Sequence, residues 1–154
     1  PWGLIGSMGF LCGAMLNLYE ILYDFVSTRT YKNRPLKEDD CIAGIIGRIA
    51  GDIDVCRILA YEAARMGDRR NKPYGYPLYS DEVACKMRNL KDFVSDRAVD
   101  VFGKAMDVLG TYGADREYDI EKHWRDIKMI QLWMGGKQLC QMEAARYFFN
   151  CETL

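Results

Sequence analysis

Four side chains that could take up or release a proton lie between residues 117 and 123. Glu117, Asp119 and Glu121 lie close together, and His123 is the single histidine. A carboxylate held at a reacting carbon can act as a general base. Acidic residues at a helix start, however, commonly only interact favourably with the helix dipole. The same carboxylates therefore also fit a structural role, and Asp126 and Glu143 are the further candidates of this kind.

Six cysteines are spread along the chain without the close pairs that structural zinc sites use. They are Cys12, Cys41, Cys56, Cys85, Cys140 and Cys151. With only His123 to add an imidazole, this spacing indicates no metal site. Several of the cysteines fall on apolar faces of expected helices, so we expect reduced thiols rather than disulfides, as in a cytoplasmic protein.

Length and charge limit the class of protein. The chain has 154 residues and a formal net charge of −1, and a chain of this length can bury a core of its own. We therefore expect a single domain over residues 1–154. Because the charges are interspersed, the sequence argues against a nucleic-acid-binding surface. Residues 1–19 carry no charge, but they lack the basic flank of a signal peptide, so we expect a buried core helix and no membrane span.

Apolar residues recur at helical spacing in five segments, which must position these side chains. The expected helices cover about residues 4–26, 39–66, 80–110, the stretch between the glycines at 113 and 135, and 137–149. Residues 27–37 and 67–79 are expected to be links, and no segment alternates for long enough to form a strand. This pattern predicts an all-α fold, an antiparallel up-and-down four-helix bundle with a short extra C-terminal helix.

Glycines mark two features of this plan. Gly3, Gly6, Gly9 and Gly13 are expected to let the first helix lie close against a neighbour. Two further glycine turns bracket the fourth helix, whose apolar stripe ends at Trp133, a residue expected to pack in the core. These turns read Gly110-Thr111-Tyr112-Gly113 and Trp133-Met134-Gly135-Gly136.

This fourth helix, with its Arg125-Asp126 pair and its two glycine turns, resembles the C-terminal helical domain of acyl-CoA dehydrogenases. These flavoenzymes desaturate an acyl-CoA between its α and β carbons. The first nine residues, Pro1 to Gly9, are similar to the start of the family's first bundle helix, so the resemblance extends over nearly the whole chain. It implies that both glycine turns serve one flavin and thioester pocket.

The resemblance implies FAD as cofactor and acyl-CoA as substrate of the complete protein. Residues 27–36 are similar to a family stretch that reaches a neighbouring subunit's flavin; aligned on Tyr31, Thr28 takes the family's Arg position and Arg29 lies one place away. Thr111 replaces a family Gly, and Asp107 a Gln. The residues implied in cofactor binding are Arg29, Tyr31, Gly110, Gly113, Gly135 and Gln138.

Met134 stands where the family often has its catalytic Glu. Removing an α-proton while hydride passes to flavin N5 requires a base, and a thioether cannot accept a proton. The resemblance thus implies a domain that completes the flavin site and builds the oligomer core, with no catalytic residue on this chain, which would be inactive alone. The alternative is a catalytically silent helical module. In either case we expect a homo-oligomer or a heteromer with related subunits.

Overall fold

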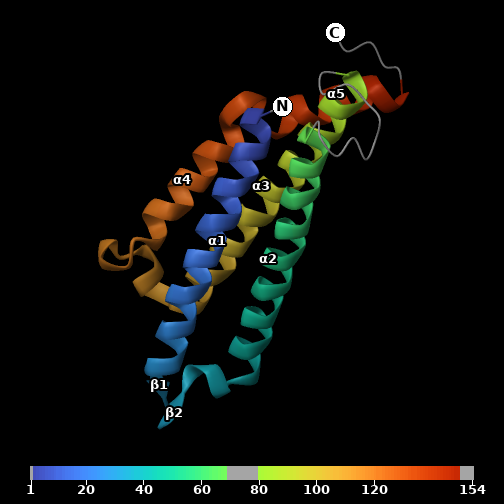
Figure 1. Cartoon of the computed structure of the whole chain (residues 1–154). Helices are drawn as coiled ribbons and strands as arrows, with labels where there is room; N and C mark the ends of the chain where they lie inside the picture. Colours follow the sequence, from blue (N-terminus) through green and yellow to red (C-terminus); the bar gives the residue numbers. More distant parts are fainter. Residues whose placement is uncertain (1, 69–79, 150–154) are drawn as a thin grey trace.

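The fold of this computed structural model, which describes residues 2–68 and 80–149, is a helical bundle. Its helices are α1 (Trp2–Thr28), α2 (Asp40–Gly67), α3 (Asp81–Leu109), α4 (Ile120–Leu132) and α5 (Gly136–Phe149). Figure 1 shows α1 to α4 running alternately down and up beside one another, while α5 crosses one end of the bundle. The predicted fold class is confirmed. The helix bounds lie within a few residues of those expected, except that α4 begins only at Ile120, after the 3-10 helices that follow Leu109.

Short elements form the links. The strands β1 (Thr30–Tyr31) and β2 (Arg34–Pro35) pair antiparallel, with Tyr31 opposite Arg34. The 3-10 helices are η1 (Leu36–Glu38), η2 (Gly110–Ala114), η3 (Arg116–Tyr118) and η4 (Trp133–Gly135). The sequence did not predict the hairpin, because two residues per strand are too few to show an alternating pattern.

The long third helix is the centre of the bundle, since α3 packs against α1, α2, α4 and α5. Its stripe of buried residues includes Val83, Met87, Val94, Val101, Ala105 and Val108. Phe102, in the middle of this stripe, is 0% exposed. The spacing of three and four residues places these side chains on one face, which accounts for their burial.

Capping side chains start two of the helices as the sequence suggests. Asp39 Oδ1 accepts hydrogen bonds from the backbone N–H groups of Cys41 and Ile42, at 3.0 and 3.2 Å. Ser80 Oγ accepts one from Val83 N–H at 3.3 Å. These bonds satisfy donors that a helix leaves unpaired in its first turn.

The apolar first helix is a core helix in this fold. Among the described residues, α1 is the one helix whose length and composition would also suit a membrane span. One face of it, from Leu4 to Val26, is buried against the other helices. The expectation for its glycines is wrong at Gly6, Gly9 and Gly13, because these lie on the exposed face, where a Cβ would meet nothing within 4 Å in the described structure. Gly3 alone of the four has a close neighbour, Met134.

The described cysteines are free thiols, namely Cys12, Cys41, Cys56, Cys85 and Cys140. Cys151 lies outside the described residues. Cys56, on α2, is 0% exposed. Burial, and then the nearby Cys12 and Asp52, raise the pKa of Cys56 from 9.0 to about 12. The folded state therefore keeps a proton on Cys56 at pH values where the unfolded chain has lost it.

This difference predicts alkaline destabilisation. The stabilising effect of the neutral Cys56 thiol is complete below about pH 9 and is lost as the pH rises toward the folded-state pKa. We expect this thiol to lower the free energy of unfolding by about 1 kcal/mol between about pH 8 and about pH 10. Urea unfolding of the unchanged chain and of Cys56→Ala at both pH values measures it, since the other titrating groups are common to both. An equal decline in the two proteins would contradict the assignment.

Candidate functional site

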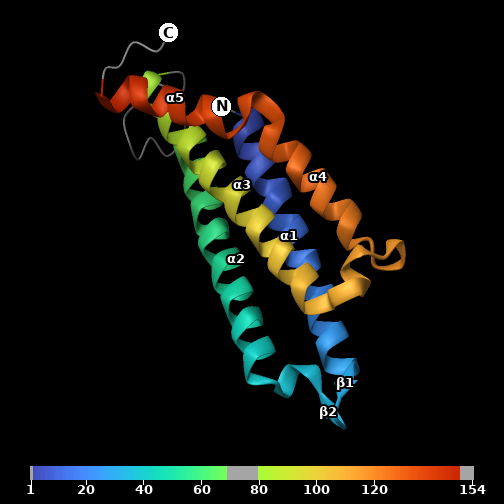
Figure 2. The ribbon, with the colours of Figure 1, turned by 180° about the vertical axis from the view of Figure 1, so that it is seen from behind.

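The residues implied in cofactor binding lie at the two opposite ends of α4. The Gly110 turn precedes α4 and the Met134 turn follows it; Figures 1 and 2 both show the two turns at different ends of the bundle. Thirteen residues of helix separate them by about 20 Å. The expectation that both turns serve one pocket of the same chain is therefore wrong, because the helix between them keeps them apart.

At one end, Arg29 joins the end of α1 to the glycine turn. Its Nη2 donates a hydrogen bond to Tyr112 Oη at 2.9 Å, and its Cζ lies 4.9 Å from the centroid of that ring. The Tyr112 ring packs against Phe25 and Tyr118, with centroid distances of 5.8 and 5.7 Å. This aromatic cluster brings together segments far apart in the sequence and holds the guanidinium at the surface.

Of the two residues that compete for the family's Arg position, only Arg29 contacts the glycine turn. Thr28 instead donates its hydroxyl to the backbone of its own helix, at Asp24 O, 2.8 Å away. Tyr31, on β1, is 62% exposed, and Lys32 Nζ lies 5.2 Å from its ring centroid. The structure thus places Arg29, Tyr31 and the Gly110 turn at the same end of the bundle.

The two glycines of this turn have different surroundings. Gly110 ends α3 with φ +59°, and a Cβ there would meet nothing within 4 Å in the described structure. A Cβ on buried Gly113 would lie only 3.0 Å from Met106 Cα. Gly110 therefore leaves open space above the backbone, whereas Gly113 permits close packing of η2 on α3.

At the other end, three consecutive residues adopt left-handed backbone angles. Met134 has φ 58° and ψ 32°, Gly135 has φ 107° and Gly136 has φ 62°. The side chain of Met134 reaches the first turn of α1, where a Cβ on Gly3 would lie 3.0 Å from Met134 Cε. This turn thus packs on the beginning of α1. Gln138 is exposed on the first turn of α5.

Trp133 corrects the expected core stripe of α4. It is 55% exposed, because α4 ends at Leu132 and the backbone turns at Trp133 to ψ 148°. Ile120 and Ile127 are buried as expected. Together with Met129 and Leu132, which are 73% and 61% exposed, Trp133 lines an apolar depression of about 500 Å³ that also includes Ile130.

A buried lysine, which was not among the residues predicted from the sequence, holds the end of α4. Lys91 on α3 is 1% exposed, and its Nζ donates to the carbonyl oxygens of Gln131 and Trp133, at 2.7 and 3.0 Å. Burial lowers the pKa of Lys91. The available signal was its position: Lys91 follows Met87 by four residues and precedes Val94 by three, within the apolar stripe.

The carboxylate of Asp96 forms further hydrogen bonds at this end of α4. Asp96 on α3 accepts hydrogen bonds from Gln131 Nε2 at 3.2 Å and from Lys137 Nζ at 2.9 Å. Asp96 therefore connects α3 with both helices that flank the Met134 turn.

Two of the carboxylates considered as bases, Glu121 and Asp126, are paired with basic residues on their own helix. Arg125 Nε donates to Glu121 at 2.8 Å, and Lys122 Nζ donates to Asp126 at 2.8 Å. These hydrogen bonds lower the pKa values of both carboxyl groups. His123 Nδ1 lies 2.7 Å from Asp119 O. A base needs a raised pKa and access to substrate, so this arrangement favours a structural role.

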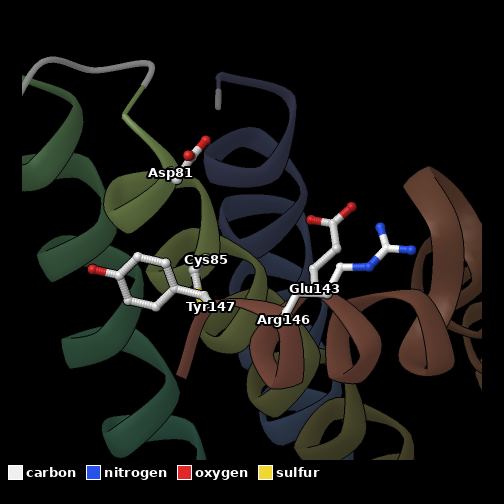
Figure 3. Close-up of a pocket in the computed structure, with 5 residues that line it drawn as sticks. All are labelled: Asp81, Cys85, Glu143, Arg146 and Tyr147. Atoms are coloured by element: carbon white, nitrogen blue, oxygen red, sulfur yellow. The ribbon is translucent and has the colours of Figure 1, made fainter. Parts of the chain in front are cut away.

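A separate polar pocket lies where α5 crosses the start of α3 (Figure 3). Its volume is about 400 Å³, and its lining residues are Asp81, Cys85, Glu143, Arg146 and Tyr147. Glu143 forms an ion pair with Arg88. Burial, followed by the charge of Glu143, raises the pKa of the Cys85 thiol, so it is a poor nucleophile at neutral pH. Within residues 2–68 and 80–149 no group of side chains could hold a metal ion.

The Arg29 end fits a phosphate-bearing cofactor in chemical terms. Arg29 is exposed and, within the described residues, forms no ion pair that would neutralise it. An unpaired guanidinium is a suitable ligand for a pyrophosphate. The open space at Gly110 adds room for an approaching group.

Comparison with known proteins agrees with the family resemblance seen in the sequence. A family model described as the C-terminal domain of acyl-CoA dehydrogenase matches residues 5–147. Cyclohexane-1-carbonyl-CoA dehydrogenase of Syntrophus aciditrophicus is 32% identical over 113 residues, which are 73% of this chain and 27% of that protein. The 3-(aryl)acrylate reductase of Clostridium sporogenes is 25% identical over 144 residues, 93% of this chain and 35% of that protein.

The fold is also similar to that of solved structures. Butyryl-CoA dehydrogenase of Megasphaera elsdenii matches with a TM-score of 0.81 at 23% identity, over 95% of this chain and 36% of that one. The chain thus spans about a third of the length of such relatives. Because the family model matches nearly all of the described residues, the chain belongs to the acyl-CoA dehydrogenase family, as a C-terminal domain.

Proposed function

We propose that this chain is the C-terminal domain of an FAD-dependent, acyl-CoA dehydrogenase-like oxidoreductase, in which it completes a flavin site and builds the oligomer core. FAD bound there would accept the hydride that leaves the β-carbon of an acyl-CoA. The remaining walls of the pocket would come from other segments or subunits. Free, buried thiols support a cytoplasmic location for such a protein.

The observation that carries this proposal is the contact between Arg29 and Tyr112, at 2.9 Å across 83 residues of sequence. It brings together the two segments that the resemblance assigns to flavin. Arg29 would hold a phosphate, and Gly110 would let the cofactor approach the backbone. Tyr31, exposed on β1, would offer a ring against the cofactor.

The opposite end of α4 would face the acyl thioester. There the turn presents Met134 and Gly135, followed by Gln138, and residues 133–138 contain no carboxylate. The turn at the family's base position therefore supplies no proton acceptor. Since α4 separates the two ends, we infer that they contribute to two different pockets of an oligomer. The exposed apolar depression at Met129, Leu132 and Trp133 supports association with a second copy or a related subunit.

A catalytically silent assembly module is the second candidate. The favouring observation is Met134, whose thioether cannot take up the substrate proton. Thr111 in place of a family Gly, and Gly136 in place of a family Thr, also favour this candidate. In this alternative the bundle would pack against an active relative and would not itself require flavin.

Flavin binding by the complete protein that contains this domain separates the two. We expect the purified protein to be yellow, and Arg29→Gln to weaken FAD binding at least about tenfold, because a charge-assisted hydrogen bond is lost. The absorbance of the bound flavin during FAD titration measures this. Arg65→Gln, on an exposed arginine near the far end of α2, is the control and should bind FAD normally. A colourless protein at saturating FAD would contradict the redox function and favour the silent module.

A further inference from the structure

We propose that Lys91 is a positioning residue, which fixes the turn between α4 and α5 and thereby the pocket wall formed by Met134. The role in a pocket rests on the proposed function. The role in holding the turn rests on the geometry of the chain itself.

Because Lys91 is buried, it does not act as a solvated surface charge. Its side chain is among the largest fully buried ones in the described structure, at 1% exposure. Placing an ammonium group inside a protein is unfavourable unless hydrogen bonds compensate for the lost water. Here the compensation comes from backbone oxygens, at Gln131 and Trp133. The Asp92 carboxylate lies near enough to favour the charged form, and Arg88 opposes it.

These oxygens belong to the end of a helix, where carbonyl groups have no partner within the helix. They also carry partial negative charge, which a cation stabilises. Trp133 O belongs to the peptide group that joins Trp133 to Met134. The hydrogen bond from Lys91 therefore fixes the orientation of the peptide group directly before Met134.

The turn needs such support because its backbone is strained. Met134 is not a glycine, yet it has φ 58°, a conformation that a side chain with a Cβ adopts only at a cost in energy. Asp96 restrains the same region by accepting hydrogen bonds from Gln131 and Lys137. Residues of α3 thus hold the turn in the conformation that places Met134 against Gly3.

Amide hydrogen exchange on the chain itself tests the positioning role. In Lys91→Met, which keeps the apolar stem but removes the donors, we expect the Trp133 amide to exchange at least about tenfold faster. This amide donates to Met129 O in the last turn of α4. The amide of His123, which donates to Asp119 O in the first turn, should keep its rate.

A second readout follows Met134 directly. In protein labelled at the methionine methyl groups, the nuclear Overhauser effect between Met134 and Gly3 should be present in the unchanged chain and lost in Lys91→Met. Lys104→Met is the matched control, because Lys104 lies on the same helix but pairs with Asp52 and Asp100. An unchanged Trp133 rate, or a retained Met134 to Gly3 contact, would overturn the proposal.

If Lys91→Met does not fold, the unchanged chain still decides the matter. Nuclear magnetic resonance should then show a coupling from Lys91 Nζ to the carbonyl carbon of Trp133 across the hydrogen bond. A Lys91 ammonium without this coupling would refute the role. These measurements need neither flavin nor acyl-CoA, so a colourless complete protein would end the redox function without affecting them. In a flavin-containing protein, Lys91→Met should weaken acyl-CoA binding about tenfold at unchanged flavin content.

Discussion

Replacing Phe102 by alanine is expected to lower the free energy of unfolding by about 4 kcal/mol, which is a large part of the stability of a domain of this size. Phe102 is 0% exposed in the middle of α3, the helix that every other helix contacts. Truncation would leave a cavity in the core beside α3, and it would remove the ring whose centroid lies 6.4 Å from that of His123 on α4. Urea unfolding followed by circular dichroism measures the change.

The matched control for this substitution lies on the same helix. Phe93 is 47% exposed, so Phe93→Ala should cost less than about 1 kcal/mol. The two variants remove the same atoms and differ mainly in burial. Equal losses would show that α3 is not the centre of the core, and the packing described above would have to be revised.

Introducing a carboxylate at Met134 is expected to produce the largest functional change. In the complete protein, Met134→Glu should increase the rate at which acyl-CoA bleaches the flavin by about 10²- to 10⁴-fold, the usual contribution of a positioned base. Glutamate has nearly the length of methionine, and the position is 38% exposed, so the fold should accept it. Stopped-flow absorbance of the flavin measures the rate.

Met134→Gln is the control, because it has the same shape as the glutamate variant without a basic oxygen. The difference between the two rates isolates proton transfer from changes in packing. Equal rates in both variants would place the base elsewhere, in a segment outside this chain. A flavin that acyl-CoA fails to bleach in either variant would instead support the silent module.

The helices were predictable because each depends on local patterns. The end of α3 at Gly110 follows from a residue that accepts φ +59° without strain, and its start at Ser80 follows from a side chain that can cap. The site was predictable only in part. The sequence could not decide between Thr28 and Arg29, since the choice depends on where Tyr112 lies across the bundle.

The misplaced and missing expectations have different causes. The two glycine turns are near each other in sequence, but a helix of 13 residues between them separates them in space. Lys91 was missed for the opposite reason, since its partners Gln131 and Trp133 are 40 and 42 residues away. Trp133 was assigned to the core because the helical pattern was extended one residue beyond the end of α4. Only the Lys91 case depends on tertiary contacts that periodicity does not report; the other two depend on the length and the end of α4.

The packing of Met134 on Gly3 has a consequence for the folding pathway. The contact joins the first helical turn of α1 to η4, the segment between α4 and α5. Gly3 and Met134 are 131 positions apart in the sequence (134 minus 3). Closing so long a segment carries a high entropic cost, which other contacts must first offset. This corner of the bundle should therefore assemble late, after the transition state, and it should be among the first regions to open when the protein unfolds.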